Sequence, residues 1–162
     1  MSVHPIAPIL AGTPHRGPML LLDRLCALVP GRYGRAVKAV TANESHKGGG
    51  EGTGGLPASL VVDALGQLAI TVLSAGSHSR PRLWFLSALE GVSWDALPRA
   101  GDVVEMEADV LRTWRGTSRV GVTATVNGSA CLRGVMVLTA GPEGASPEGG
   151  GRGDASPEGV AA

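Results

Sequence analysis

The sequence predicts an α+β domain in which an antiparallel sheet wraps around one long central helix. Three observations support this fold class: a helical pattern in residues 57 to 75, two strand-like segments before it and four after it. A doubly wound nucleotide-binding fold would instead alternate strands with helices. One domain is expected, because 162 residues with 43% hydrophobic content are enough for one core.

The helix is predicted from PASLVVDALGQLAITVLSA, residues 57 to 75. Pro57 suits the first turn of a helix, and Gly76 stands where a helix would end. Polar residues recur at every fourth position of an otherwise apolar run, which indicates a helix buried nearly all round with one narrow polar stripe. The stripe consists of Ser59, Asp63, Gln67 and Thr71.

Asp63 is the only ionisable residue of this stripe. A solvated helix face normally carries Lys, Glu and Arg, whereas Asp63 has apolar neighbours on both sides. A carboxyl group in such surroundings suits general acid–base chemistry. The alternative is that Asp63 lies at a solvent-facing seam, and helical periodicity alone does not separate the two interpretations.

The strands are predicted from valine-rich segments in which polar and apolar residues partly alternate. In one of them Val104 and Met106 fall on one face, and Glu105 and Glu107 fall on the other. Asn127-Gly128 is a strong signal for a two-residue hairpin turn. The predicted strands cover residues 19–29, 32–42, 84–94, 102–114, 118–126 and 130–138.

Composition argues against several classes of function. Lys+Arg and Asp+Glu both number 14, and the aromatic residues are three Trp, one Tyr and one Phe, so nucleic-acid binding is not expected. The uncharged apolar runs are shorter than the roughly 20 residues of a bilayer span, and the N-terminus lacks the pattern of a signal peptide. We therefore expect a cytoplasmic protein, with Cys26 and Cys131 as small buried side chains.

The composition changes near residue 140. Residues 141–162 repeat PEG three times and contain few apolar side chains, so they cannot bury enough surface to offset chain entropy. This predicts a domain over residues 1–140, followed by a disordered tail rich in Gly, Pro and Glu.

The glycine-rich stretch GGGEGTGGLP, residues 48 to 57, contains the pattern GxGxxG at Gly50, Gly52 and Gly55. That pattern can cradle a pyrophosphate at a helix N-terminus. A dinucleotide fold would need repeated strand–helix–strand units after it, and antiparallel strands are predicted instead. We attribute the match to glycine abundance, since the chain has 25 glycines.

Three segments resemble the (3R)-hydroxyacyl-acyl-carrier-protein dehydratases of fatty-acid synthesis in order and spacing. They are residues 13–41, which include PHRGPMLLLDR, residues 56–69, LPASLVVDALGQLA, and residues 85–111. The first is the most specific, and the resemblance covers roughly residues 5 to 140. It implies a hot-dog fold, in which an antiparallel sheet wraps around one central helix.

The resemblance also implies a reaction, the removal of water from a 3-hydroxyacyl thioester on acyl carrier protein. In this family a loop histidine takes the proton beside the thioester carbonyl, and a helix carboxylate of the partner subunit assists departure of the hydroxyl. The carboxylate corresponds to Asp63. Gln67 and the backbone N–H of Ala58, at the helix start, correspond to substrate-binding groups, and His15 would brace the fold.

The sequence departs from the family at the catalytic histidine. Family members have a His-Phe-Pro-Gly run, and an ungapped match puts Gly49 in the histidine position. His46 lies three residues further from Pro57. Either the glycine run loops out these residues and returns His46 to the site as a base, or it fills a loop without a catalytic role.

This departure is similar to the dehydratase-like hot-dog proteins of aryl-polyene and polyketide-like clusters. In those proteins Gly-Leu-Pro precedes the helix, as in Gly55-Leu56-Pro57, and the usual loop motif is missing. Some of them are thought to work paired with a paralogue.

Three functions stay open on the sequence alone. The first is a 3-hydroxyacyl-carrier dehydratase, and the second is a catalytically inactive subunit that binds acyl chains or completes the site of a paralogue. The third is a hot-dog acyl thioesterase that uses the helix carboxylate to activate water. We expect acyl carrier protein as a partner, a homodimer or a heterodimer with a paralogous hot-dog subunit, and neither an organic cofactor nor a metal.

Overall fold

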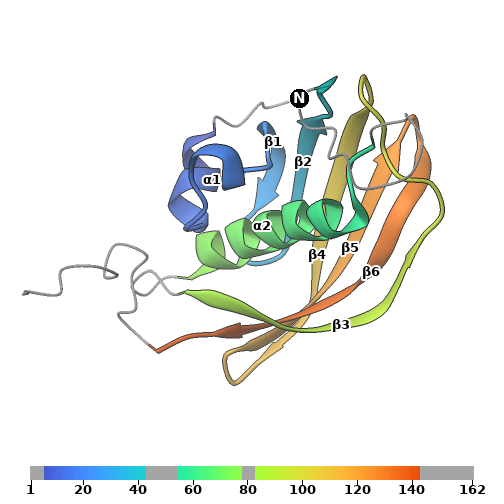
Figure 1. Ribbon diagram of the computed structural model, residues 1–162. Helices are drawn as coiled ribbons and strands as arrows, with labels where there is room; N and C mark the ends of the chain where they lie inside the picture. Colours follow the sequence, from blue (N-terminus) through green and yellow to red (C-terminus); the bar gives the residue numbers. More distant parts are fainter. Residues whose placement is uncertain (1–5, 43–54, 78–82, 143–162) are drawn as a thin grey trace, which may run out of the picture.

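A computed structural model describes residues 6–42, 55–77 and 83–142 and shows a six-stranded antiparallel sheet wrapped around one long helix (Figure 1). This confirms the predicted α+β hot-dog arrangement. His46 and the tail from residue 143 lie outside the described residues. The elements are α1 (Ala7–Gly12), a 3-10 helix (Gly17–Met19), β1 (Arg24–Val29), β2 (Tyr33–Ala39), α2 (Ala58–Gly76), β3 (Trp84–Trp94), β4 (Val103–Trp114), β5 (Thr117–Val126) and β6 (Ser129–Ala140).

The strand order in the sheet is β1-β2-β4-β5-β6-β3. Strands β4, β5 and β6 follow one another as a meander. Strand β2 pairs with β4, although α2 and β3 lie between them along the chain. Strand β3 crosses to the far edge and pairs with β6, and α2 lies across the concave face of the curved sheet (Figure 1).

Two tight hairpins hold the meander together. Asn127 and Gly128 have φ values of 51° and 80°, as a type I′ turn requires, which confirms the hairpin predicted from the sequence. Arg115 and Gly116 adopt the same conformation between β4 and β5, with φ values of 47° and 79°. This second turn was not predicted, because Arg at its first position is a weak signal.

The core lies between α2 and the inner face of the sheet. Met106 and Ala108 of β4 are buried there, while Glu105 and Glu107 are exposed on the outer face, as the alternating pattern predicts. By length and composition α2 is apolar enough to cross a membrane, but ten of its residues are buried against the rest of the domain. Its apolar character is therefore explained by its place in the core.

The elements differ from the prediction at several places; β2, for example, ends at Ala39 rather than at residue 42. Strand β1 begins at Arg24 rather than at residue 19, because Gly17–Met19 forms a 3-10 helix and the next residues run along α2. Pro57 is the N-cap of α2 instead of part of its first turn. Helix α1, six residues long, was not predicted, because so short a helix shows no clear period.

Candidate active site

The start of α2 is held in place by the loop before β4. Leu56 donates its backbone N–H to the carbonyl oxygen of Pro98 at 2.7 Å, and Gly55 forms a bridge with Arg99. The first intrahelical bonds run from the N–H groups of Leu60 and Val61 to the carbonyl oxygen of Pro57. Among the described residues no side chain caps this end, so the preceding amides, including that of half-buried Ala58, are available to an acceptor.

Asp63 and Gln67 form a hydrogen-bonded pair one turn apart on α2. The Gln67 side chain is buried, with 1% exposed, and its Nε2 donates to Asp63 Oδ2 at 3.1 Å. Asp63 is half-buried. Gln67 also uses its other groups: Nε2 donates to the carbonyl oxygen of Met19 at 2.7 Å, and Oε1 accepts the N–H of Leu21 at 2.9 Å.

The N-terminal segment covers the second half of the polar stripe. Gly12 packs so closely on α2 that an added Cβ would lie 2.8 Å from the Cα of Thr71. Ser74 Oγ donates to the carbonyl oxygen of Gly12 at 3.1 Å, and Thr71 is fully buried. Gln67 and Thr71 are therefore covered by this chain itself.

The backbone partners of Gln67, Met19 and Leu21, were not predicted from the sequence. Met19 and Leu21 belong to PHRGPMLLLDR, the segment with the most specific resemblance, but a sequence does not show which carbonyl meets which amide. The segment therefore has a physical role: it fixes the amide that orients Asp63.

His15 lies in the same segment. Its Nδ1 is 2.5 Å from the hydroxyl of Thr13, which is buried with 2% exposed. Arg16 donates to the carbonyl oxygen of Thr13 at 2.6 Å. These contacts tie the segment to itself, in keeping with a bracing role for His15.

The described residues contain no group of three or more His, Cys, Asp or Glu side chains that could hold a metal ion. Cys26 and Cys131 are both free thiols. Burial raises the pKa of the Cys131 thiol, which donates to the carbonyl oxygen of Ala124 at 3.3 Å, so this group stays protonated and unreactive at neutral pH.

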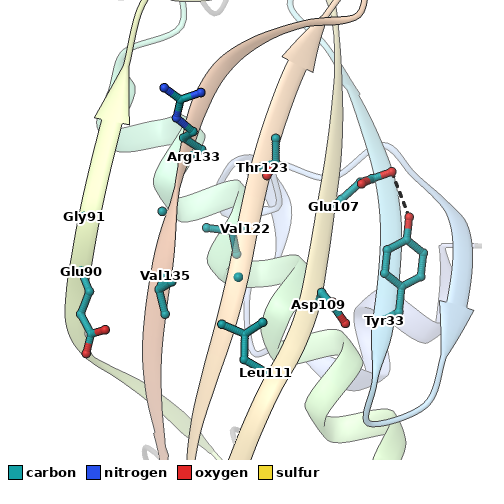
Figure 2. Close-up of a pocket in the computed structure, with 12 residues that line it drawn as sticks. Tyr33, Glu90, Gly91, Glu107, Asp109, Leu111, Val122, Thr123, Arg133 and Val135 are labelled. Atoms are coloured by element: carbon teal, nitrogen blue, oxygen red, sulfur yellow. Dashed lines mark hydrogen bonds between the residues drawn. The ribbon is translucent and has the colours of Figure 1, made fainter.

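An open hollow lies on the outer face of the sheet, lined by residues of all its strands except β1 (Figure 2). Tyr33 donates its hydroxyl to Glu107 Oε1 at 2.9 Å on one side (Figure 2). Burial and then the bond to Glu107 raise the pKa of Tyr33, so the phenol stays protonated. Glu90 on the other side pairs with Arg119. The hollow lies on the face of the sheet opposite α2 (Figure 2), so it is separate from Asp63.

Comparison with known proteins identifies the family of this chain. The chain is 33% identical over 124 residues to the 3-hydroxyacyl-[acyl-carrier-protein] dehydratase FabZ of Geobacillus thermodenitrificans, covering 76% of this chain and 86% of the relative. It is 34% identical over 123 residues to FabZ of Chloroflexus aggregans, covering 75% and 85%. No family model matches. The chain belongs to the 3-hydroxyacyl-[acyl-carrier-protein] dehydratase FabZ family.

Solved structures show the same fold at lower identity. The dehydratase heterocomplex ApeI:P from Xenorhabdus doucetiae superposes with a TM-score of 0.70 at 15% identity, covering 83% of this chain and 91% of that one. A hypothetical thioesterase with coenzyme A from Streptococcus pneumoniae has a TM-score of 0.58 at 9% identity, covering 74% and 85%. At these identities the likeness establishes the fold alone.

Proposed function

We propose that this chain removes water from 3-hydroxyacyl thioesters carried by acyl carrier protein, with Asp63 as its acid. Membership of the FabZ family supports the reaction, and it does not favour the thioesterase or the inactive subunit. The observation that carries the assignment to Asp63 is its carboxylate, half-buried near the uncapped start of α2 and held by the buried amide of Gln67.

The reaction requires one proton to leave C2 and the hydroxyl to leave C3. A base takes the proton, the electron pair of the C–H bond becomes the C2=C3 double bond, and the C3–O bond breaks. Asp63 gives its proton to the departing hydroxyl, which leaves as water. Ala58 N–H donates to the thioester oxygen as negative charge develops there, and the helix dipole adds to this stabilisation.

In this proposal Gln67 belongs to the substrate-binding part of the site, where it positions the carboxylate of Asp63. Its Nε2 donates to Asp63 and to Met19 and its Oε1 accepts from Leu21, which fixes the direction of Nε2 and so the orientation of the Asp63 carboxylate. A carboxylate held in one orientation costs less to align with the departing hydroxyl.

His46 is the proposed base, delivered by the glycine-rich segment before α2. The supporting argument is chemical: a base is required at C2, and His46 is the histidine nearest to Pro57 along the chain. Replacement His46→Ala tests this, with an expected fall in kcat of about 10²-fold or more. Unchanged turnover would assign the base to another group.

A second hot-dog subunit is proposed at the β3 edge. Neighbouring side chains of a strand point to opposite faces, yet Phe85 and Leu86 are 55% and 48% exposed, so the described residues cover neither face. Leu89 and Trp94 add to this apolar edge. Pairing of β3 with β3 of a second copy, or of a paralogue, would bury it; ApeI:P is itself a heterocomplex.

No organic cofactor or metal is needed for this chemistry, and we propose that none is used. The burial of α2 in the core supports a soluble protein, and we place it in the cytoplasm with acyl carrier protein.

Intact-protein mass spectrometry of a 3-hydroxyacyl carrier protein incubated with the purified chain tests the proposal. Loss of one water from the carrier is the expected result. Release of the unacylated carrier would instead establish a thioesterase. An unchanged carrier would favour either an inactive subunit or one that works only in a heterodimer. Adding a paralogue that has the His-Phe-Pro loop would distinguish the two, because only the heterodimeric subunit should then increase the loss of water.

A further inference from the structure

The outer face of the sheet carries opposite charges at the two ends of strand β4. The side chains of Glu105, Glu107 and Asp109 are exposed on this face, and Figure 2 shows the last two of them. The next charged residues along the chain are exposed and basic: Arg112 in the strand and Arg115 in the turn that follows. One strand therefore presents an acidic half and a basic half to solvent.

The strand register places Arg112 of β4 directly opposite Arg119 of β5. Both lie on the outer face, since Arg119 is two residues from Gly121, the partner of Asp109. Like charges directly opposite each other on neighbouring strands destabilise a sheet. Arg119 is paired with Glu90, whereas Arg112 forms no ion pair within the described residues. The fold of one chain therefore gives no reason for a positive charge at Arg112.

Exposed apolar side chains accompany these charges. Leu111 is 56% exposed and stands between Asp109 and Arg112, where the register of β4 shifts. Trp114 is 59% exposed, and the guanidinium of Arg115 lies 4.6 Å from the centre of its ring. Trp and Arg are enriched among the residues that dominate the binding energy of protein interfaces. The composition of this face is therefore typical of an interface.

We propose that the outer face binds the outer face of a second copy of this chain. The two copies are related by a two-fold axis that lies between the two sheets and crosses β4 at right angles near Leu111. In such an interface the same surface meets itself, so the acidic half of one chain faces the basic half of the other. Asp109 of each chain then lies beside Arg112 of the other.

The geometry of the face suits this contact. Packed sheets lie about 10 Å apart with their strands within about 30° of one another, so β4 of one chain runs antiparallel along β4 of the other. Asp109 and Arg112 lie on either side of Leu111 and therefore exchange places under the two-fold axis. The hollow beside them is lined by Gly121 and Gly134, which have no side chains, so among the described residues it leaves room for Leu111 of the second chain.

This contact is separate from the proposed pairing at the β3 edge, because it uses the face of the sheet and not its edge. The two contacts together would join four chains, and the outer-face contact alone would join two. The inference does not depend on the proposed dehydration, so either can fail without the other.

The test measures the mass of the full-length assembly by sedimentation equilibrium at low salt. Arg112→Asp should halve the wild-type mass, because two carboxylates then meet at each contact. Asp109→Arg should also halve it, because two guanidinium groups then meet. The variant that carries both exchanges has opposite charges at each contact again, so it should recover the wild-type mass.

Arg99→Glu is the matched control. It reverses one exposed charge on the loop beside the start of α2, away from the outer face. Its mass should equal that of the wild type. Circular dichroism checks that each variant is folded, and the double exchange keeps the number of charges on β4, so it tests the pairing even where a single variant loses stability.

Four results would overturn the inference. A wild type that sediments as one chain, or a wild-type mass that neither single variant reduces, would show that the outer face does not join copies. A fall in both single variants that the double exchange does not reverse would exclude the pairing of Asp109 with Arg112. An equal fall in Arg99→Glu would show that net charge, rather than this face, controls the assembly.

Discussion

The two halves of the polar stripe on α2 share one sequence pattern and have different surroundings. Gln67 and Thr71 are buried beneath the N-terminal segment, and their side chains are hydrogen-bonded within the chain. Ser59 is exposed and Asp63 is half-buried. A polar residue at every fourth position therefore serves the fold in one half of the helix and remains available for chemistry in the other.

The difference follows from what covers each half. The segment from Gly12 to Leu21 crosses α2 with its backbone close to the helix, so its carbonyl and amide groups need buried partners. Gln67 supplies them. The comparison predicts that substitutions in the covered half mainly reduce stability, and that those in the open half mainly reduce activity.

Gln67→Leu should have the largest effect on stability. It leaves the Leu21 N–H and the Met19 carbonyl without their side-chain partner in a buried place, so the free energy of unfolding should fall by about 3 kcal/mol. Urea unfolding followed by circular dichroism measures this. A loss below about 1 kcal/mol would show that water replaces the Gln67 amide, and that water reaches the covered half of the polar stripe.

Gly12→Ala should cost about 2 kcal/mol, because the new Cβ would overlap the Cα of Thr71 and force the segment away from α2. Gly66→Ala is its control, since no side chain of the described residues lies within 4 Å of the new Cβ, and the change should not destabilise the fold. The same unfolding assay applies. Equal stabilities for the two variants would contradict the close packing of the N-terminal segment.

Thr71→Val should reduce the free energy of unfolding by about 1 kcal/mol or less. The change keeps the shape of the side chain and removes the 2.8 Å hydrogen bond from Thr71 Oγ1 to the carbonyl oxygen of Gln67. That carbonyl also lies within the helical ladder, so it does not lose every partner. A loss as large as that of Gln67→Leu would show a partner for the hydroxyl beyond this bond.

Ser59→Ala should have the smallest effect, within about 0.5 kcal/mol of the wild type, because the side chain is exposed and caps nothing. Turnover should also be unchanged. A decrease in turnover with unchanged stability would show that Ser59, the first residue of the stripe, also takes part in the reaction.

Much of the fold was predictable because it depends on local patterns. Alternation placed Met106 inside and Glu107 outside, and Asn127-Gly128 marked its turn. The contacts of Gln67 were not predictable, since its partners Leu21 and Met19 lie 46 and 48 residues away along the chain. The position of β3 at the sheet edge is likewise a long-range feature that no local pattern specifies.

The same distinction between local patterns and long-range contacts applies to the candidate site. Asp63 was identified from helical periodicity and the family resemblance, both of which a sequence displays. The orientation of its carboxylate depends on Gln67 and on the backbone of a distant segment. That His46 is the base stays a prediction, because it falls outside the described residues.

Asp63→Asn is the most direct test of the proposed role of Asp63 as the acid, with turnover and stability measured on the same preparation. Asn keeps the size of the side chain, and its oxygen can still accept from Gln67, so the free energy of unfolding should stay within about 1 kcal/mol of the wild type. The variant should lose about 10³-fold in kcat for dehydration of a 3-hydroxyacyl carrier protein, because it lacks the acid proposed to protonate the departing hydroxyl. Turnover at the wild-type rate in a folded Asp63→Asn protein would contradict the proposal that Asp63 is the acid.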